Sequence, residues 1–286
     1  MQPFPMRYPR DAHSHADLSF LLDAPAGHDG FVTIQEGHLV RPDGTRLRLW
    51  GVNVTDWTPG SVLFPSKADA PLYAATLARF GVNCVRLHFL DLPAPRGLID
   101  DTRDDTQHFD AEQLDRLDFW VAALKQQGIY CDLNLLVGHS YKAGDGVQDA
   151  DKIGWAKAVA YFDPRLIALQ KAYAAQILTH RNPYTGTGYR HEPAIIIIEL
   201  LNENSLIEAW HGGRLRAGDG TALPAYYTDM LDQMYGAYLQ RRAPAEQTFV
   251  WLLCASTPQE SAFSMPRTRC LSFSLAAAHN PNAPSM

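Results

Sequence analysis

The sequence lacks several features that would assign a chain to a class at once. No apolar run in its 286 residues reaches the length of a membrane span, and the first residues, MQPFPMRYPRDAHSHAD, contain no apolar core of a signal peptide. The four cysteines form no Cys-x-x-Cys or mixed Cys/His spacing, so a structural zinc site is not expected. We therefore expect a protein without a membrane partner, either cytoplasmic or secreted with its signal removed.

An excess of basic charge is also absent. The formal net charge is -6 at pH 7, which gives no electrostatic footprint for nucleic acid or for an anionic membrane. Hydrophobic residues make up 46% of the chain, enough for a sizeable core in one large or two small domains. Cys84 and Cys131 stand within apolar runs, where cysteine usually behaves as a small buried hydrophobe.

Strand and helix patterns alternate over most of the chain. Residues 31–50 contain two alternating runs around Pro42-Asp43-Gly44, which is hairpin chemistry. The sequence then predicts strands at 50–55, 84–89, 129–138 and 195–201, and helices at 68–80, 111–128, 163–181 and 226–242. Asp163 followed by Pro164 predicts a helix N-cap with proline in the first turn. Strands that alternate with helices of this length form βαβ units around a parallel sheet.

This alternation predicts an α/β fold of the (β/α)8 TIM-barrel type, with an N-terminal β-hairpin and about four to five βα units. Residues 248–254 are a candidate fifth strand, and no sixth, seventh or eighth unit is recognisable after them. We divide the chain into a leader at 1–30, an incomplete barrel domain at 31–254 and a tail at 255–286. The tail is rich in serine, alanine and proline, and we interpret it as a loose or altered end of a truncated barrel.

The stretch IIIIELLNENS, residues 195–205, points to a functional site. Four isoleucines describe a strand of a parallel sheet that is buried on both faces. The run nevertheless passes directly into Asn202, Glu203 and Asn204. Ligands bind at the carboxyl ends of parallel strands, so this polar cluster predicts a binding or catalytic site.

Polar and aromatic side chains also stand at the ends of the other predicted strands. A carboxylic acid surrounded by amides, an arginine, histidines and a tryptophan suits the cleavage of a sugar chain. The acid protonates the leaving oxygen, the amides bind hydroxyl groups and the tryptophan stacks on the sugar. We expect Glu203 to be the catalytic residue, and the substrate to contact Arg86, His88, Asn202, Asn134, His139, Trp57 and Asn53.

Three segments, GHLVRPDGTRLRLWGVNVT, GVNCVRLHF and LLNENS, together resemble glycoside hydrolase family 5 and its clan of retaining (β/α)8 enzymes, the cellulases and β-mannanases. The resemblance covers residues 31–242. It implies that Glu203 is the acid/base, that Asn202 binds the sugar hydroxyl next to the scissile bond, and that Arg86 supports the nucleophile. It also implies a carbohydrate substrate of β-linked glucan or mannan, a retaining double displacement and no cofactor or metal.

The chain departs from this family at the nucleophile. The family's nucleophile is a second glutamate at the end of the seventh strand, which is not recognisable here. Glu260 is the only carboxylate after Glu246, and it follows no recognisable strand. The activity of the chain therefore stays open, and an inactive sugar-binding remnant of the barrel is an alternative. The sheet edges of such a remnant favour dimerisation or aggregation.

Other interpretations compete for the same residues. Glu203 can serve the N-terminus of the following helix, Arg86 can pair with a core carboxylate, and Glu199 is predicted to be structural. Asp11-Ala-His13-Ser-His15 looks like the His-x-His motif of metal-dependent amidohydrolases. The segment MRYPR before it is no apolar strand, so surface histidines are the better interpretation.

Overall fold

The computed structural model describes residues 16–56, 62–215 and 222–241. The chain divides into two compact units, Met1–Pro224 and Ala225–Met286, and each is described by itself. The predicted fifth strand at 248–254, the tail at 255–286, the His13/His15 motif, Trp57 and Glu260 lie outside the described residues. No helix in the described ranges is long and apolar enough to cross a membrane.

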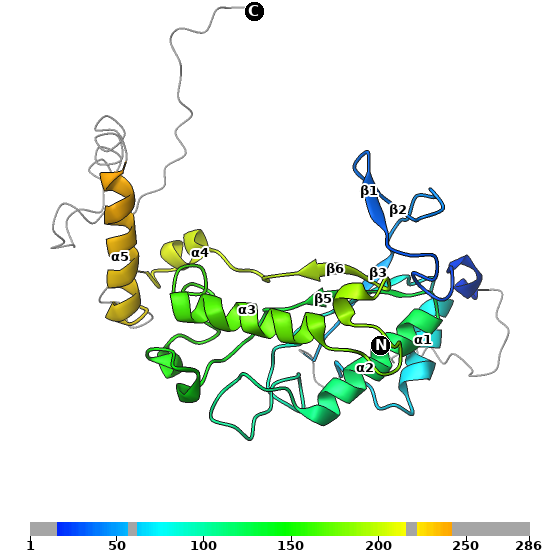
Figure 1. Cartoon of the computed structure of the whole chain (residues 1–286), viewed down its shortest axis with the longest axis horizontal. Helices are drawn as coiled ribbons and strands as arrows, with labels where there is room; N and C mark the ends of the chain where they lie inside the picture. The colour runs from blue at the N-terminus through cyan, green and yellow to red at the C-terminus, as the bar shows by residue number, and fades with distance from the viewer. Residues whose placement is uncertain (1–15, 57–61, 216–221, 242–286) are drawn as a thin grey trace, which may run out of the picture. The chain divides into compact units, whose positions relative to one another are not determined.

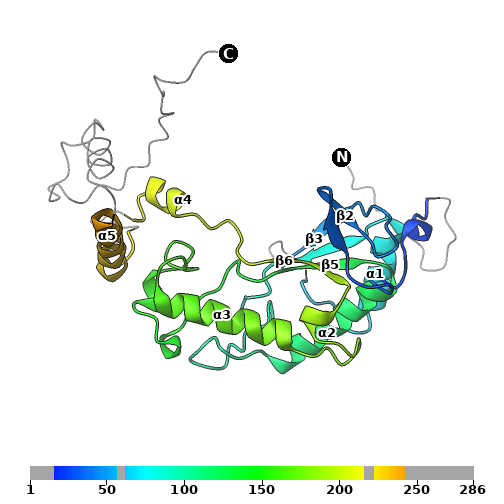
Figure 2. The same ribbon diagram turned by 45° about the horizontal axis from the view of Figure 1, so that its top comes forward.

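The first unit is built around a parallel sheet of four strands, β3 (Gly51–Val54), β4 (Cys84–Leu87), β5 (Tyr130–Asn134) and β6 (Ile195–Glu199). Their order in the sheet is the order of the chain, whereas doubly wound sheets reverse direction part-way. Helices α1 (Ala70–Arg79), α2 (Ala111–Gln126) and α3 (Pro164–Thr179) lie on one side of this sheet (Figures 1 and 2). The predicted α/β fold of barrel type is confirmed, and the barrel is not closed within the described residues.

The helices begin where the sequence predicts N-caps. Asp163 precedes α3, and its carboxylate accepts a hydrogen bond of 2.8 Å from the Leu166 amide. Asp110 caps α2 in the same way through the Gln113 amide. The main core lies between sheet and helices, and its fully buried members include Val85, Leu87, Leu117, Val121, Leu124, Leu133 and Ile177.

The central and outer strands differ in burial. All five residues of β5 are buried, although two of them are Asp132 and Asn134. In β6 only Ile195 is buried, and Ile198 keeps 39% of its surface exposed. The expectation that the isoleucine strand is buried on both faces is therefore wrong. Its partner in the described sheet is β5 alone, so one edge of β6 remains uncovered there.

The hairpin forms one turn earlier than predicted. Strands β1 (Thr33–Gln35) and β2 (His38–Val40) are joined by Glu36 and Gly37, which both have positive φ, as a tight hairpin turn requires. The predicted Pro42-Asp43-Gly44 turn also forms, and it leads into an antiparallel bridge between Val40 and Arg46.

The amino-terminal end of the sheet is covered by residues that precede and follow this hairpin. Ala26, Leu47, Tyr130 and Ala194 form a small buried cluster there. The Ala26 amide donates a hydrogen bond of 2.8 Å to the Lys125 carbonyl at the end of α2. Cys84 and Cys131 are free and buried, as the sequence predicted, and burial raises the pKa of the Cys84 thiol to about 12.

A short helix that the sequence did not predict follows β6. It is α4 (Leu206–His211), and the Ser205 hydroxyl caps it by accepting from the Glu208 amide. The described residues of the first unit also contain four 3-10 turns, at Ser19–Leu21, Ala143–Asp145, Ala150–Lys152 and Tyr189–His191. The second unit contains α5 (Ala225–Gln240), close to the predicted helix at 226–242.

Candidate functional site

The guanidinium of Arg86 is the centre of the polar groups at the carboxyl end of the sheet. It binds the Glu199 carboxylate through Nε and Nη2, at 2.6 Å each, in the bidentate geometry that carboxylates favour. Nη2 also donates to Asn202 Oδ1 at 2.9 Å, and Nη1 donates to Asn53 Oδ1 at 3.3 Å. Parallel pairing sets Asn53 beside Arg86, so the contact follows from the register.

His88 and Asn134 complete this group. Nη1 of Arg86 lies 2.9 Å from His88 Nδ1, which must accept because a guanidinium only donates. Burial and the arginine charge both lower the pKa of His88. The Asn134 amide donates to the same Glu199 carboxylate. We call these six residues, Asn53, Arg86, His88, Asn134, Glu199 and Asn202, the arginine cluster.

Two carboxyl groups lie side by side at the base of the arginine cluster. Burial raises the pKa of Asp132, and the neighbouring Glu199 carboxyl raises it further. The Arg86 guanidinium lowers the pKa of Glu199 below its ordinary value. Since one carboxyl faces the cation and the other is buried beside it, a shared proton belongs on Asp132. Glu199 therefore stays ionised and holds Arg86 in place.

Glu203 lies at the same end of the sheet but outside the arginine cluster. Its backbone is left-handed, with φ of 46°, which is unusual for a residue other than glycine and recurs at functional sites. The side chain is 82% exposed, and its Oε2 is 3.8 Å from the Lys157 ammonium. A catalytic acid is expected to be buried beside a second carboxylate, and Glu203 in the described structure is not.

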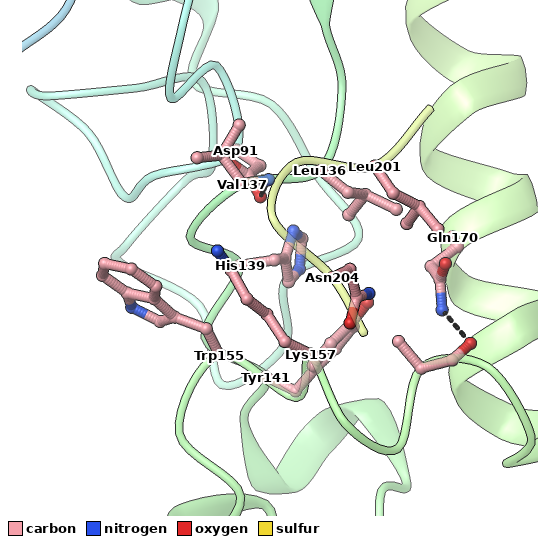
Figure 3. A pocket seen from close by; sticks show the side chains of 11 residues that line it. Asp91, Leu136, Val137, His139, Tyr141, Trp155, Lys157, Gln170, Leu201 and Asn204 are labelled. Atoms are coloured by element: carbon pink, nitrogen blue, oxygen red, sulfur yellow. Dashed lines mark hydrogen bonds between the residues drawn. The ribbon is translucent and has the colours of Figure 1, made fainter. Parts of the chain in front are cut away.

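A pocket lies between the loops that follow β4, β5 and β6 (Figure 3). His139, predicted as a substrate contact, lines this pocket and is not part of the arginine cluster. Asp91 forms part of the pocket floor, and its carboxylate accepts from the Val137 and Gly138 amides at 2.8 and 3.0 Å. These bonds tie the loop after β4 to the loop after β5, which fixes the shape of the pocket.

The structure thus brings together five of the predicted contact residues, Asn53, Arg86, His88, Asn134 and Asn202, and places Glu203 and His139 nearby. Sequence reasoning missed Asp132 as a member of the site and did not foresee that Glu199 binds Arg86. Asp132 had a signal, because a carboxylate within the apolar run YCDLNLLV needs a partner or a proton when buried. No sequence pattern indicated Lys157, because it stands in an irregular loop.

No metal site accompanies these groups in the described part of the chain. Among those residues, no three histidine, cysteine, aspartate or glutamate side chains are arranged to hold an ion. The Asp132 and Glu199 carboxyls, the two neighbours that could start such a site, are engaged with each other and with Arg86.

We expect His139→Gln to change how stability depends on pH. Burial lowers the pKa of His139 from 6.5 to about 4. The contribution of His139 to the free energy of unfolding is therefore complete above pH 6.5 and is lost as pH falls through about 4. Burial raises the pKa of Asp91 from 3.8 to about 6, so its contribution is complete below pH 3.8 and is lost as pH rises through about 6. In the wild type, the two groups therefore change the free energy of unfolding in opposite directions as pH rises from 4 to 6. Each effect amounts to at most about 1.4 kcal/mol per pH unit.

The variant keeps only the Asp91 slope. Its free energy of unfolding, measured by urea denaturation, should therefore decline relative to the wild type as pH rises from 4 to 6. His38→Gln, at the exposed first position of β2, is the matched control and should run parallel to the wild type. A parallel curve for His139→Gln as well would contradict the low pKa of the buried histidine.

Comparison with known proteins gives two curated relatives. Over 104 residues, the chain is 30% identical to mannan endo-1,4-beta-mannosidase 2 of Oryza sativa subsp. japonica. The matched region covers 34% of this chain and 23% of that protein. Over 103 residues, it is 30% identical to mannan endo-1,4-beta-mannosidase 2 of Arabidopsis thaliana, covering 33% and 23%. The predicted resemblance to the cellulase and β-mannanase clan is confirmed by these relatives over about a third of the chain. The matches span less than a quarter of either relative's length.

Solved structures give more distant matches, and no family model matches the chain. The endo-1,4-beta-mannanase from Rhizomucor miehei matches with a TM-score of 0.49 and 17% identity, covering 74% of this chain and 57% of that one. The endo-beta-1,4-mannanase from Thermotoga petrophila matches with a TM-score of 0.42 and 19% identity, covering 69% and 40%.

Proposed function

We propose that the chain carries part of the active site of a glycoside hydrolase that acts on β-1,4-linked mannan by a retaining double displacement. The observation that carries this proposal is the 2.9 Å hydrogen bond from Arg86 to Asn202, immediately before Glu203, at the carboxyl end of the parallel sheet. That contact orients the amide next to Glu203, and sugar cleavage uses a carboxylic acid with amides beside it that bind the sugar hydroxyls. The similarity to two mannan endo-1,4-beta-mannosidases supports mannan over glucan as the substrate.

In this mechanism Glu203 donates a proton to the leaving oxygen while a second carboxylate attacks the anomeric carbon. Water then hydrolyses the glycosyl-enzyme, with Glu203 acting as base. Asn202 is oriented by Arg86, so its amide nitrogen can donate to the sugar hydroxyl next to the scissile bond. The exposed carboxylate of Glu203 can be reached by a substrate that arrives from solvent.

Two parts of the mechanism concern residues outside the described ranges. Trp57 is proposed as a stacking surface for a sugar ring. The nucleophile is not identified: Glu260 is the one carboxylate after Glu246, and no recognisable strand precedes it. No cofactor enters the proposed chemistry, because proton transfer and a carboxylate nucleophile suffice for glycoside hydrolysis.

Sugar binding without turnover is the second candidate function. This function is supported by the contacts of the two carboxyl groups near Arg86, those of Glu199 and Asp132. Glu199 is held by Arg86 and Asn134, and Asp132 is buried beside it, so neither is available to attack a sugar. A chain with this arrangement and no further carboxylate would bind mannan and leave it intact.

Parallel measurements of binding and cleavage separate the two functions. We expect mannohexaose to bind more tightly than cellohexaose in calorimetry, and reducing ends to be released slowly or not at all, because no nucleophile is identified. Robust cleavage that disappears in Glu260→Gln would instead establish the tail as the source of the nucleophile. NMR of the first product should show retained anomeric configuration. A chain that neither binds nor cleaves mannohexaose would contradict both functions.

A further inference from the structure

The pocket between the loops after β4, β5 and β6 is large enough for water and too small for a larger ligand. Its cavity volume is about 20 Å³. A buried water needs roughly 10–15 Å³ of such space and about two to four polar partners. The polar groups that line the pocket therefore decide whether water enters it.

The hydrogen bonds of Thr106 determine which nitrogen of His139 carries the proton. The Thr106 hydroxyl donates to Asp145 Oδ2 at 2.9 Å, and the Thr106 amide donates to Oδ1 at 3.0 Å. Because its hydrogen is used there, the hydroxyl must accept from His139 Nε2, 2.8 Å away. The proton of the neutral ring is therefore on Nε2, and Nδ1 carries a lone pair.

That lone pair is buried and has no donor. His139 Nδ1 has no hydrogen-bond partner within the described residues. Burial lowers the pKa of His139 to about 4, so the ring stays neutral at neutral pH and Nδ1 stays an acceptor. A buried acceptor without a donor raises the free energy of the folded state, and a hydrogen bond from water removes this cost.

Asn204 presents a second acceptor to the same pocket. Its Oδ1 is buried and likewise has no partner in the described ranges. His139 and Asn204 both line the cavity, and Figure 3 shows their side chains near its middle. Two acceptors on one cavity of this size can be joined by a small molecule that carries two hydrogens.

The rest of the lining selects a neutral donor. Gln170 Nε2 already donates to the Ala160 carbonyl at 2.9 Å, and the Asp91 carboxylate already accepts from two amides of the loop after β5. Lys157, whose ammonium lies 5.6 Å from the centre of the Trp155 ring, adds a positive charge that disfavours a cation. The two acceptors disfavour an anion, so water is the occupant that fits both the volume and the charge.

The pocket adjoins the segment that carries Glu203. The left-handed backbone of Glu203 costs free energy and persists only where the surrounding structure holds it. Before it, the Asn202 amide donates to the Leu136 carbonyl at 2.9 Å, and the Asn202 side chain is held by the arginine cluster. After it, the Asn204 carbonyl accepts from the Tyr161 hydroxyl. An occupant that binds the Asn204 side chain therefore adds a further hold on Glu203.

We propose that buried water bridges His139 Nδ1 and Asn204 Oδ1 and so ties the loop after β5 to the segment that carries Glu203. Each acceptor receives a water hydrogen, and His139 is a positioning residue that acts through the water. The bridge stands on the cavity and its two acceptors, whereas its importance for catalysis rests on the proposed function of Glu203.

A high-resolution crystal structure of the full chain tests the bridge directly. We expect ordered water in the pocket at hydrogen-bonding distance, about 2.7–3.2 Å, from His139 Nδ1 and from Asn204 Oδ1. In solution, ¹⁵N NMR should show a neutral His139 ring with the proton on Nε2 and with Nδ1 shifted upfield, as acceptance of a hydrogen bond requires. A dry pocket, a protonated Nδ1 or a direct hydrogen bond from the Asn204 amide group to Nδ1 would overturn the bridge.

Asn204→Leu tests whether the bridge positions the Glu203 segment. The variant removes one acceptor, so we expect the Asn202 amide to exchange with solvent about 5- to 30-fold faster than in the wild type. The amides of α2 should keep their rates, because the change is local. Equal acceleration of both sets would indicate a general loss of stability and would overturn the positioning role.

Two further variants control this measurement. Asn204→Asp keeps an acceptor oxygen and should leave the exchange rate of the Asn202 amide within about 3-fold of the wild type. Gln148→Leu removes an exposed amide group from the segment between β5 and α3, which also carries His139, and should exchange as the wild type does. If Asn204→Leu does not fold, the crystal structure and the NMR of the wild type still decide.

The outcomes separate the bridge from the proposed function. Ordered water in the pocket of a chain that neither binds nor cleaves mannohexaose would support the bridge and overturn the proposed function. A dry pocket in a chain that binds mannohexaose would overturn the bridge alone. Ordered water combined with an unchanged Asn202 exchange rate in Asn204→Leu would overturn the positioning role of His139.

Discussion

Where the wild type releases reducing ends from β-mannan, Glu203→Gln should slow that release by about 10²–10⁴-fold, the usual loss when a general acid–base is removed. Glutamine keeps the shape of the side chain and can still form hydrogen bonds, but it cannot deliver a proton to the leaving oxygen. Glu208→Gln, five positions along the chain and exposed on α4, is the matched control and should leave the rate unchanged.

The leaving group makes this prediction specific to an acid–base role. A nitrophenyl glycoside needs little protonation in the first step, so Glu203→Gln should still form the glycosyl-enzyme from it. Hydrolysis of that intermediate needs the base and should be slow, and added azide should restore turnover by attacking without a base. If both substrates slow equally and azide restores nothing, Glu203 is not the acid–base.

Arg86→Met should produce the largest loss of stability. It leaves the Glu199 and Asp132 carboxyls side by side without their cation. Breaking a buried ion pair from one side costs about 3–5 kcal/mol; we expect roughly 2–3 kcal/mol here because the two side chains keep 26% and 30% of their surface exposed. Arg116→Met, which removes an exposed pair with Glu112 on α2, is the matched control and should cost under about 0.5 kcal/mol.

The loss in Arg86→Met should depend on pH. In the wild type, Arg86 lowers the pKa of Glu199, so the pair's contribution is present above the ordinary glutamate pKa and is lost as pH falls through the lowered value. In the variant, the two neighbouring carboxyls share a proton, which raises one pKa and makes acid stabilising. Urea unfolding should show a large difference from the wild type at pH 8 and a small one at pH 5.

A second substitution checks that the carboxylate is the cause. Adding Glu199→Gln to Arg86→Met removes the unpaired charge and should restore part of the stability at pH 8. A double variant no more stable than the single one would mean that the loss comes from packing of the arginine side chain and not from its charge.

The sequence predicted part of the arginine cluster, because the ends of the predicted strands determine which side chains lie together at the edge of the sheet. In a parallel sheet, residues at the carboxyl ends of neighbouring strands lie abreast, so Asn53, Arg86 and Asn202 could be placed together from strand boundaries alone. The bidentate contact to Glu199 could not, because it depends on whether β6 ends at residue 199 or at residue 201. The predicted strand continued to residue 201, which made Glu199 a mid-strand residue.

The exposure of β6 and the contacts between loops could not be predicted from the sequence, for a different reason. The isoleucines of β6 predict a strand, but their exposure depends on what covers the strand, and that is set by tertiary packing. The pocket of His139, Trp155, Lys157 and Asn204 joins irregular segments that follow β5, precede α3 and follow β6. Such segments have no periodicity, so their mutual distances appear only in the folded chain.

The matching order of strands in the chain and in the sheet has a consequence for how the protein assembles during synthesis. Each strand of β3 to β6 pairs only with strands next to it in sequence among the described elements, so every addition closes a loop of one βα unit. Closing such a loop costs less entropy than pairing strands that are further apart in the chain. A strand that emerges from the ribosome can therefore dock at once on its predecessor, and the arginine cluster becomes complete only when β6, which supplies Glu199, has joined.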